Sequence, residues 1–314
     1  MIEIRDLTKT YGAFKALDGL TMMVREKTVY GFVGPNGAGK TTAMAIVATL
    51  IRPTSGTARV GGYDVTEHPD RVRRLIGYMP DFFGVYDRFR AAEYLDFYGA
   101  CYGISRADRL KKIPRLLELV DLADKADVYV DSLSRGMKQR LCLARCLIHD
   151  PEVLVLDEPA SGLDPRARIE MREILKELKK MGKTILISSH VLPELAEMAD
   201  DIGVIENGRL LAQGNVREIQ ERMRAGRLLH IRLLDRAGEA AEFLRGRPGV
   251  AAVESLDDAG ARAVQVQVRF SGDDAMQREL LRALVESGFP VVSFHEEEAN
   301  LEDVFLEITK GVRA

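Results

Sequence analysis

The residues best suited to chemistry lie in one short loop, Gly34-Pro35-Asn36-Gly37-Ala38-Gly39-Lys40-Thr41-Thr42. Apolar runs at 28–33 and 43–51 flank this loop, which predicts a buried strand, a tight glycine turn and the start of a helix. Glycines let successive backbone N–H groups point at one anion, and the positive end of the following helix faces the same place. Lys40 adds a full positive charge, and the Thr41 hydroxyl suits Mg²⁺. The spacing therefore predicts a nucleoside triphosphate site. The alternative is a glycine-rich turn that carries Lys-Thr by chance.

Two carboxylates follow the apolar stretch 153–156, which is typical of a central parallel strand buried on both faces. Asp157 and Glu158 stand at its carboxyl end, where ligands of α/β sheets bind. We expect Asp157 to hold Mg²⁺, directly or through water, and Glu158 to polarise an attacking water. A solvated strand end is the alternative interpretation.

Three further positions have both a structural and a functional interpretation. Ser134, in the polar loop 131–137, suits a helix N-cap, and with the Gly136 N–H it also suits a second phosphate contact. His190 ends the predicted strand 184–188 on the ligand side, so we favour a γ-phosphate contact over a structural role. Tyr11, in a predicted loop at 8–12, could pack in the core or stack on an adenine ring.

The composition is that of an ordinary globular protein of about two domains. Of the 314 residues 46% are hydrophobic, and the net charge of −3 provides no general attraction for nucleic acid or for anionic membranes. No stretch approaches the roughly 18 apolar residues that cross a bilayer, and the start of the chain does not resemble a signal peptide. The three cysteines, Cys101, Cys142 and Cys146, fit a reduced cytoplasm, with burial favoured over a metal site.

Aromatic residues are concentrated between positions 82 and 102, where eight of the chain's twenty are found. Tyr94, Phe97 and Tyr98 have helical spacing and could be plain core, but aromatic enrichment is also typical of interfaces. Core packing and a docking surface both remain open for this cluster. Helical patterns continue beyond it at 106–122, which predicts a mostly α segment inserted into an α/β chain.

In their order along the chain, these motifs resemble the nucleotide-binding subunit of ABC transporters over residues 1–227. Gly34–Thr42 is similar to the Walker A loop, and 153–159 to Walker B with its catalytic glutamate. Residues 133–140 resemble the family signature and 161–164 the D-loop, which includes Asp164. His190 corresponds to the switch histidine. The resemblance implies a RecA-like P-loop NTPase core with an antiparallel β subdomain and an inserted helical subdomain at about 82–150. It also implies ATP and Mg²⁺ as cofactors, and favours Tyr11 as the adenine-stacking residue.

Three residues depart from the family pattern. Asp81 stands where the family usually has a glutamine that touches Mg²⁺ and the lytic water. A carboxylate can still ligate Mg²⁺, so Asp81 is retained as a metal and catalytic candidate, although it adds negative charge beside the phosphates. Arg135 and Met137 replace the commoner Gly and Gln of the signature, while Ser134 and Gly136 remain. Both variants also resemble the subfamily that serves ABC-2 type exporters.

The tail, residues 228–314, supports that subfamily. Its middle part has a predicted βαββαβ order, which favours a small ferredoxin-like α+β domain, followed by a helix at 301–310. The ending 300–305 is similar to that of ABC-2 ATPases. The tail carries no catalytic constellation, and a regulatory or dimer-stabilising role for it rests on resemblance.

The resemblance implies an ATPase that works as a homodimer, with two ATP molecules each held between the Lys40 side of one copy and the Ser134 side of the other. Opening and closing would drive a separate integral membrane permease that docks near Asp81–Tyr102, at the cytoplasmic face of the membrane, and this permease would determine the cargo. Competing hypotheses are a soluble ABC-type ATPase acting on the ribosome or DNA, and a scaffold that does not hydrolyse ATP. The single ATPase unit and the absence of long heptad runs disfavour the first, and intact Lys40, Asp157 and Glu158 disfavour the second.

Overall fold

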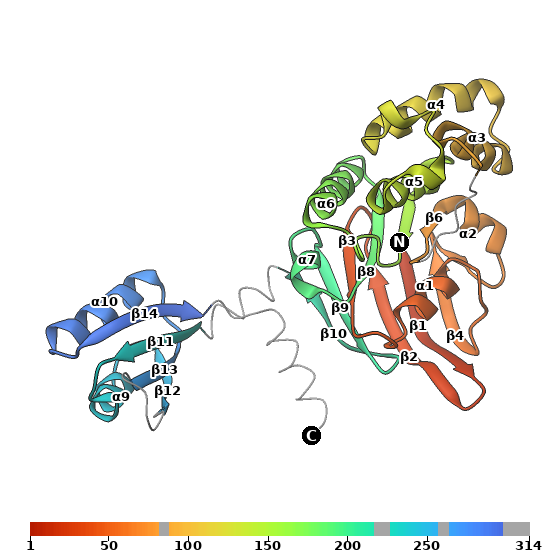
Figure 1. Cartoon of the computed structure of the whole chain (residues 1–314). Coiled ribbons are helices and arrows are strands. Elements are labelled where there is room, and N and C mark those ends of the chain that lie inside the picture. The colour runs from red at the N-terminus through yellow and green to blue at the C-terminus, as the bar shows by residue number, and fades with distance from the viewer. Residues whose placement is uncertain (82–87, 217–226, 257–263, 298–314) are drawn as a thin grey trace. The chain divides into compact units, whose positions relative to one another are not determined.

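The computed structural model describes residues 1–81, 88–216, 227–256 and 264–297 (Figure 1). Its contacts divide the chain into two compact units, Met1–Val216 and Arg217–Ala314. No helix among the described residues has both the length and the apolar character that crossing a membrane requires.

A six-stranded sheet forms the centre of the first unit, in the order β10-β9-β3-β8-β7-β6. Every pair from β9 to β6 is parallel, and only the edge strand β10 is antiparallel. All residues of β3 and β7 are buried, as their continuous apolar runs predict. The strands are β3 (Val29–Val33), β6 (Ile76–Met79), β7 (Val153–Leu156), β8 (Thr184–Ser189), β9 (Asp201–Glu206) and β10 (Arg209–Asn215).

A second, antiparallel sheet has the order β2-β1-β4-β5. Its strands are β1 (Ile2–Tyr11), β2 (Phe14–Val24), β4 (Ser55–Val60) and β5 (Tyr63–Asp64). The prediction of a loop at 8–12 was wrong, because β1 continues to Tyr11 and pairs with Phe14 across a two-residue turn. Register shifts along this hairpin interrupt the apolar alternation by which the strand could have been recognised.

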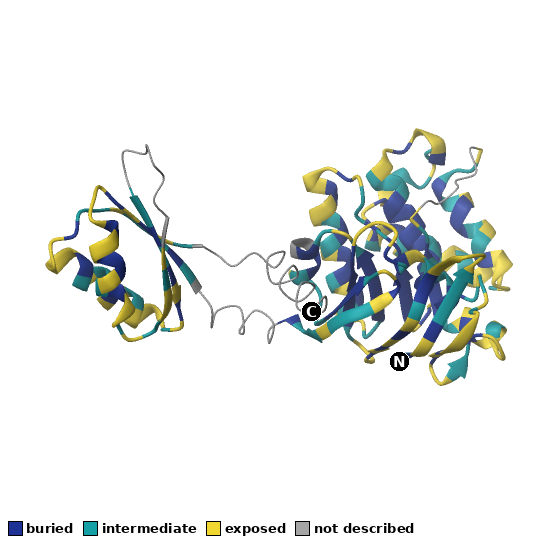
Figure 2. Cartoon of the chain, turned by 90° about the horizontal axis from the view of Figure 1, so that it is seen from below, coloured by how far each residue is buried: buried dark blue, intermediate teal, exposed yellow. Residues whose placement is uncertain are grey.

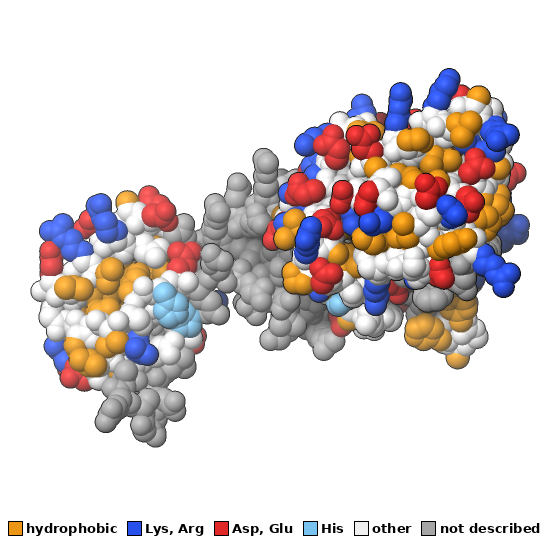
Figure 3. All heavy atoms as spheres, turned by 45° about the horizontal axis from the view of Figure 1, so that its top comes forward, with side chains coloured by type: hydrophobic (Ala, Val, Ile, Leu, Met, Phe, Trp, Pro, Cys, Tyr) orange, Lys and Arg blue, Asp and Glu red, His pale blue; other side chains and the backbone are white. Residues whose placement is uncertain are grey.

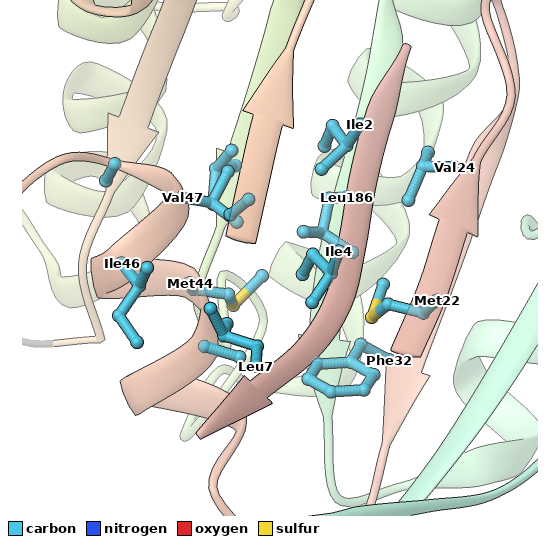
Figure 4. Packing of buried hydrophobic residues seen from close by; sticks show 14 of the residues in the cluster. Ile2, Ile4, Leu7, Met22, Val24, Phe32, Met44, Ile46, Val47 and Leu186 are labelled. Carbon is cyan, nitrogen blue, oxygen red and sulfur yellow. The ribbon is translucent and has the colours of Figure 1, made fainter. Parts of the chain in front are cut away.

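The main core lies between these two sheets and includes helix α1 (Lys40–Val47). In Figure 4 Ile2, Ile4 and Leu7 of β1 face Met44 of α1 and Leu186 of β8. Helix α1 ends earlier than the predicted residue 51, because Thr49 already has a positive φ of 63°. Figure 2 shows buried residues along the strands and exposed ones along the outer helices.

The segment between β6 and β7 is mainly helical, as expected for an inserted α segment. It contains α3 (Ala91–Cys101), α4 (Arg106–Leu119), two 3₁₀ turns (Ala123–Lys125 and Val130–Ser132) and α5 (Arg135–Leu147). Helix α2 (Pro69–Leu75) precedes β6, and α6 (Pro165–Lys180) and α7 (Leu192–Ala196) follow β7 and β8.

The second unit has the predicted βαββαβ order. Its sheet order is β12-β13-β11-β14 with every pair antiparallel, the arrangement of a ferredoxin-like sandwich. The elements are β11 (Arg227–Leu233), α9 (Ala237–Arg245), β12 (Val250–Leu256), β13 (Val264–Phe270), α10 (Asp274–Glu286) and β14 (Val291–Glu297). Leu229, Ile231, Val266 and Val268 of its sheet pack with Leu244 and other helical residues in a core of its own. The helix predicted at 301–310 lies outside the described residues.

Candidate nucleotide-binding site

The predicted phosphate loop joins the end of β3 to the start of α1. Gly37 and Gly39 have φ values of 84° and 107°, which L side chains rarely adopt. A Cβ at Gly34 would stand 2.2 Å from the carbonyl oxygen of Ile205 in β9, so this position has no room for a side chain. The turn between β9 and β10 also supports the loop, since the Gly208 N–H donates to the Ala38 carbonyl at 2.9 Å. The β9–β10 hairpin therefore supports the conformation of the phosphate loop.

Lys40 is buried and turns back over this loop. Its Nζ donates to the carbonyls of Gly34 at 2.6 Å and Pro35 at 3.2 Å, and lies 3.5 Å from Oε1 of Glu158. Thr41 and Thr42 occupy the first turn of α1, where Thr41 is exposed and Thr42 half-buried. The ammonium group is thus placed where the phosphate loop, the N-terminus of α1 and the Glu158 carboxylate meet.

Asp157 and Glu158 directly follow the end of β7, and their side chains lie in different environments. Asp157 is fully buried, and its Oδ1 accepts a hydrogen bond of 2.6 Å from the Ser188 hydroxyl of β8. Its Oδ2 is buried with no hydrogen-bond donor among the described residues. Glu158 has a positive φ of 49°, and its N–H donates to the same Ser188 oxygen at 2.9 Å.

Glu158 also contacts His190, which follows β8; this contact was not predicted from the sequence. Oε2 of Glu158 lies 2.9 Å from Nδ1 of His190, whose side chain is 47% exposed. The structure therefore brings together Lys40, the adjacent pair Asp157–Glu158 and His190, which come from three distant parts of the sequence. Ser188 belongs to the same cluster, and its role was missed because a serine inside an apolar strand carries no motif.

Asp81 is exposed beyond the end of β6, the strand next to β7. Met79 of β6 accepts a hydrogen bond of 2.8 Å from the Asp157 N–H, so the chain leading to Asp81 is tied to the carboxylate cluster. Burial, together with the negative charges of Asp157 and Asp81, raises the pKa of Tyr78 to about 12.

Ser134 caps α5, as predicted, by accepting a hydrogen bond of 3.3 Å from the Met137 N–H. A Cβ at Gly136 would approach Ala167 of α6 to 3.0 Å, which places this residue against α6. Asp164 caps α6 through the Ala167 N–H at 3.0 Å. The structure therefore places all three residues along the α5–α6 contact.

Two unpredicted contacts join the signature segment to 161–164. Arg135, a departure from the family pattern, has its guanidinium so close to Gly162 that a Cβ there would lie 2.6 Å from it. Gln139 donates to the Ser161 carbonyl at 3.2 Å. Neither contact could be read from local sequence patterns.

Tyr11 ends β1 with 49% of its surface exposed, and the ammonium group of Lys9 lies 5.0 Å from its ring centroid. The exposed ring excludes core packing, which was one of the two interpretations of this residue. An exposed aromatic ring remains suited to stacking.

The donor set fits Mg²⁺. Asp157 Oδ2 is a buried carboxylate oxygen that lacks a hydrogen-bond donor within the described part of the chain, and Thr41 and Asp81 carry further oxygen atoms on neighbouring elements. Mg²⁺ prefers oxygen ligands and usually binds through one or two carboxylates together with substrate phosphates. These residues would hold the ion, and the bound ion would neutralise charge on the phosphates.

Comparison with known proteins places the chain in a family. Residues 17–161 match the ABC transporter family model, and residues 214–309 match the C-terminal domain of DrrA1-3-like ATP-binding proteins. The chain is 35% identical to Nod factor export ATP-binding protein I of Ralstonia nicotianae, over 98% of this chain and 94% of the relative. It is 36% identical to the daunorubicin/doxorubicin resistance ATP-binding protein DrrA of Streptomyces peucetius, over 98% and 92%.

Solved structures agree with this placement. The ATP-binding subunit of an ABC transporter superposes with a TM-score of 0.64 at 30% identity, covering 71% of this chain and 92% of that one. A dimeric bacterial ABC transporter cassette gives 0.64 at 25% identity, covering 69% and 99%. The fold and the strand–loop–helix around Lys40 are those of a P-loop ATPase. The chain belongs to the family of ABC transporter ATP-binding proteins, and its hydrolysis of ATP is coupled to transport.

Proposed function

We propose that this chain powers an ABC-2 type exporter by binding and hydrolysing ATP at the cluster around Lys40. The observation that carries the proposal is the pair Asp157–Glu158, held by one Ser188 hydroxyl beside the buried Lys40 ammonium group. Relatives with export or resistance names, which match over nearly the whole chain, support the exporter assignment.

Each residue of the cluster has a distinct proposed role. The N–H groups of 34–39 and the Lys40 ammonium bind phosphates, and Thr41, Asp157 and Asp81 hold Mg²⁺. Glu158 accepts a proton from the attacking water, His190 contacts the γ-phosphate, and Tyr11 stacks on the adenine.

Nucleotide binding would change the contacts of Lys40. Its partners are now the carbonyls of Gly34 and Pro35 and the carboxylate of Glu158. Phosphate oxygens carry more negative charge than carbonyls, so Lys40 exchanges these partners for ATP and releases Glu158 toward the water.

The second half of each site comes from another copy of the chain. Ser134, Gly136 and Asp164 lie along the α5–α6 contact at the starts of these helices, where N–H groups and helix dipoles favour an anion. We infer that they meet the γ-phosphate held by the partner copy. These γ-phosphate contacts exist only in the closed dimer, so ATP binds the closed dimer more tightly than the open one. ATP binding therefore favours closure.

A separately encoded integral membrane permease docks near Asp81–Tyr102, which places the chain at the cytoplasmic face of the membrane. In the described part of this region, Phe97 and Tyr102 are 39% and 46% exposed, more than core aromatics would be. Positions 82–87, with three of the clustered aromatics, lie outside the described residues.

The alternative of a soluble ATPase on the ribosome or DNA has no supporting observation. On the face in Figure 3, Lys and Arg are interspersed with Asp and Glu over the first unit. This face shows no continuous patch of positive charge of the kind that binds nucleic acids. The deciding experiment is copurification from membranes together with an ATPase assay. An integral membrane partner that stimulates turnover supports the proposal, and a ribosomal or DNA partner contradicts it.

A further inference from the structure

Two histidines of the second unit, His230 and His295, lie directly opposite each other on neighbouring strands. His230 belongs to β11 and His295 to β14, and the antiparallel pairing of these strands puts the two residues in register. Their rings are stacked, with centroids 5.2 Å apart and an interplanar angle of 12°. The fold therefore places side by side two imidazoles that come from distant parts of the sequence.

Both histidines lie on the face of the sheet that is turned away from α9 and α10. The residues on either side of His230 in β11, Leu229 and Ile231, are fully buried and pack with these helices in the core of the unit. Successive side chains of a strand point to opposite faces, so His230 and its register partner His295 belong to the other face. His230 is half-buried and His295 exposed, and histidine is visible at the surface of the second unit in Figure 3. Solvent therefore reaches this pair.

A glutamine of the same face orients the ring of His230. The side-chain amide of Gln265, in β13, lies 2.7 Å from Nδ1 of His230. When the amide turns its oxygen toward this nitrogen, it accepts the Nδ1–H and leaves the lone pair of Nε2 for a ligand. Histidines that bind metals are usually held in this way, through a hydrogen bond of the ring nitrogen that does not bind. The contact thus makes Nε2 the ligand atom of His230.

We propose that His230 and His295 together bind one transition-metal ion of the Zn²⁺, Ni²⁺ or Cu²⁺ class. Imidazole nitrogens suit these ions, whereas Mg²⁺ takes oxygen ligands. A metal–nitrogen distance of about 2.1 Å puts two ligand nitrogens roughly 3.4 Å apart in a tetrahedral arrangement. Strand residues that lie directly opposite have Cβ atoms about 5 Å apart, so the two rings can tilt toward a common ion while the backbone stays in place.

The two nitrogens are the protein ligands of this site. Within the described part of the chain, no group of three or more His, Cys, Asp or Glu side chains could hold a metal. Water would complete the coordination, so the site is open, unlike the closed four-ligand centres that serve a purely structural role.

A shared ion would join β14, the edge strand of the sheet, to its neighbour β11. Both strands must be in place before the two nitrogens can meet, so the ion binds the folded second unit and stabilises it. The inference goes beyond the proposed function, because this site takes nitrogen ligands in the second unit and the ATP site takes oxygen ligands in the first. It adds a possible input of transition metal to the unit that carries no catalytic residues.

Calorimetric titration of the metal-free full chain with Ni²⁺, with Mg²⁺ present throughout, tests the site. The parent chain for this test carries Cys101→Ser, because an exposed thiol can bind the same ion. The proposal predicts one Ni²⁺ per chain. Gln265→Ala should weaken binding about tenfold, as loss of an outer partner of a metal ligand does, and His230→Gln or His295→Gln should weaken it further.

The matched control is His68→Gln, which removes an exposed histidine of the first unit and should bind Ni²⁺ as the parent chain does. Equal affinity in the parent chain, His230→Gln and His295→Gln means an adventitious ion only, and overturns the proposal. Circular dichroism of each variant shows whether it is folded. Because Gln265→Ala keeps both ligands, it still tests the site if a histidine variant fails to fold.

Electron paramagnetic resonance with Cu²⁺ counts the ligands directly. The nitrogen splittings should show two coordinated imidazoles in the parent chain and fewer in His230→Gln and in His295→Gln. The unfolding temperature gives a further readout, since Ni²⁺ should raise it in the parent chain and not in His295→Gln. A parent spectrum without two coordinated nitrogens, or an equal rise of the unfolding temperature in His295→Gln, contradicts the shared site.

Discussion

Ser188 donates its hydroxyl proton to Oδ1 of Asp157 at 2.6 Å. The Ser188 hydroxyl oxygen also accepts a hydrogen bond of 2.9 Å from the Glu158 N–H, so one side chain of β8 positions both carboxylates that follow β7. Glu158 adopts a positive φ of 49°, which is uncommon for a residue with a side chain, and the bond to Ser188 helps hold it there. The proposed metal ligand, Asp157, and the proposed base, Glu158, are therefore both positioned by Ser188.

Replacing that support should separate catalysis from binding. Ser188→Ala is expected to lower kcat about tenfold, because a buried hydrogen bond to a charged group contributes roughly 1.5–3 kcal/mol. The affinity for ATP should change by less than about threefold, since Lys40 and the loop glycines are untouched. The matched control is Ser189→Ala, whose hydroxyl bonds the Val191 N–H instead. Equal kcat values for Ser188→Ala and wild type would remove Ser188 from its positioning role.

Gly34 should tolerate no side chain. A Cβ there would meet the Ile205 carbonyl oxygen at 2.2 Å and the Ile205 Cγ2 at 2.9 Å, so β9 or the phosphate loop must shift. Gly34→Ala is therefore expected to reduce the free energy of unfolding by about 1–3 kcal/mol, the usual cost of overpacking. Denaturant titration measures this change. Gly238→Ala in α9, where a Cβ meets nothing within 4 Å, serves as the control and should not destabilise the chain.

His149 gives the stability a defined pH dependence. Burial lowers its pKa below the ordinary value of 6.5, and its Nε2 lies 2.9 Å from the Ile76 carbonyl while Nδ1 is buried without a partner among the described residues. As the pH falls below about 6.5, the unfolded chain takes up a proton that the folded chain resists, so the free energy of unfolding decreases.

The check is the slope of unfolding free energy between pH 7.5 and 5.5. His149→Gln should flatten that slope relative to wild type, whatever its effect on absolute stability. His68→Gln, at an exposed position before α2, is the matched histidine-to-glutamine control. Parallel slopes for wild type and His149→Gln would contradict the assignment.

The sequence was sufficient for features that depend on local spacing. The loop 34–42 between a strand and a helix, the buried run before Asp157 and the N-cap at Ser134 all follow from residues close together in the chain. The central strands that are buried on both faces, and the βαββαβ order of the second unit, were predicted in the same way.

Features that depend on distant residues could not be predicted. Ser188 reaches Asp157 from 31 positions away, and Arg135 closes over Gly162 between two helix starts. Neither residue has a pattern that reveals its partner, because parallel sheet neighbours are set by the whole topology. The strand at 8–11 was missed for a related reason, since its bulged pairing hides the alternation.

The central claim is that two copies of the chain enclose ATP between Lys40 of one and Ser134 of the other. Glu158→Gln should bind ATP and hydrolyse it hardly at all, since the amide cannot accept the proton of the attacking water, and the closed pair should accumulate. Its double variant with Ser134→Arg should bind ATP but stay monomeric, because the second phosphate contact is blocked.

Sedimentation equilibrium of Glu158→Gln at high concentration, with ATP and Mg²⁺ present, tests this claim most directly. The account predicts twice the monomer mass of 34.9 kDa with ATP and the monomer mass with ADP. A monomer with ATP, both alone and together with the permease, would contradict it.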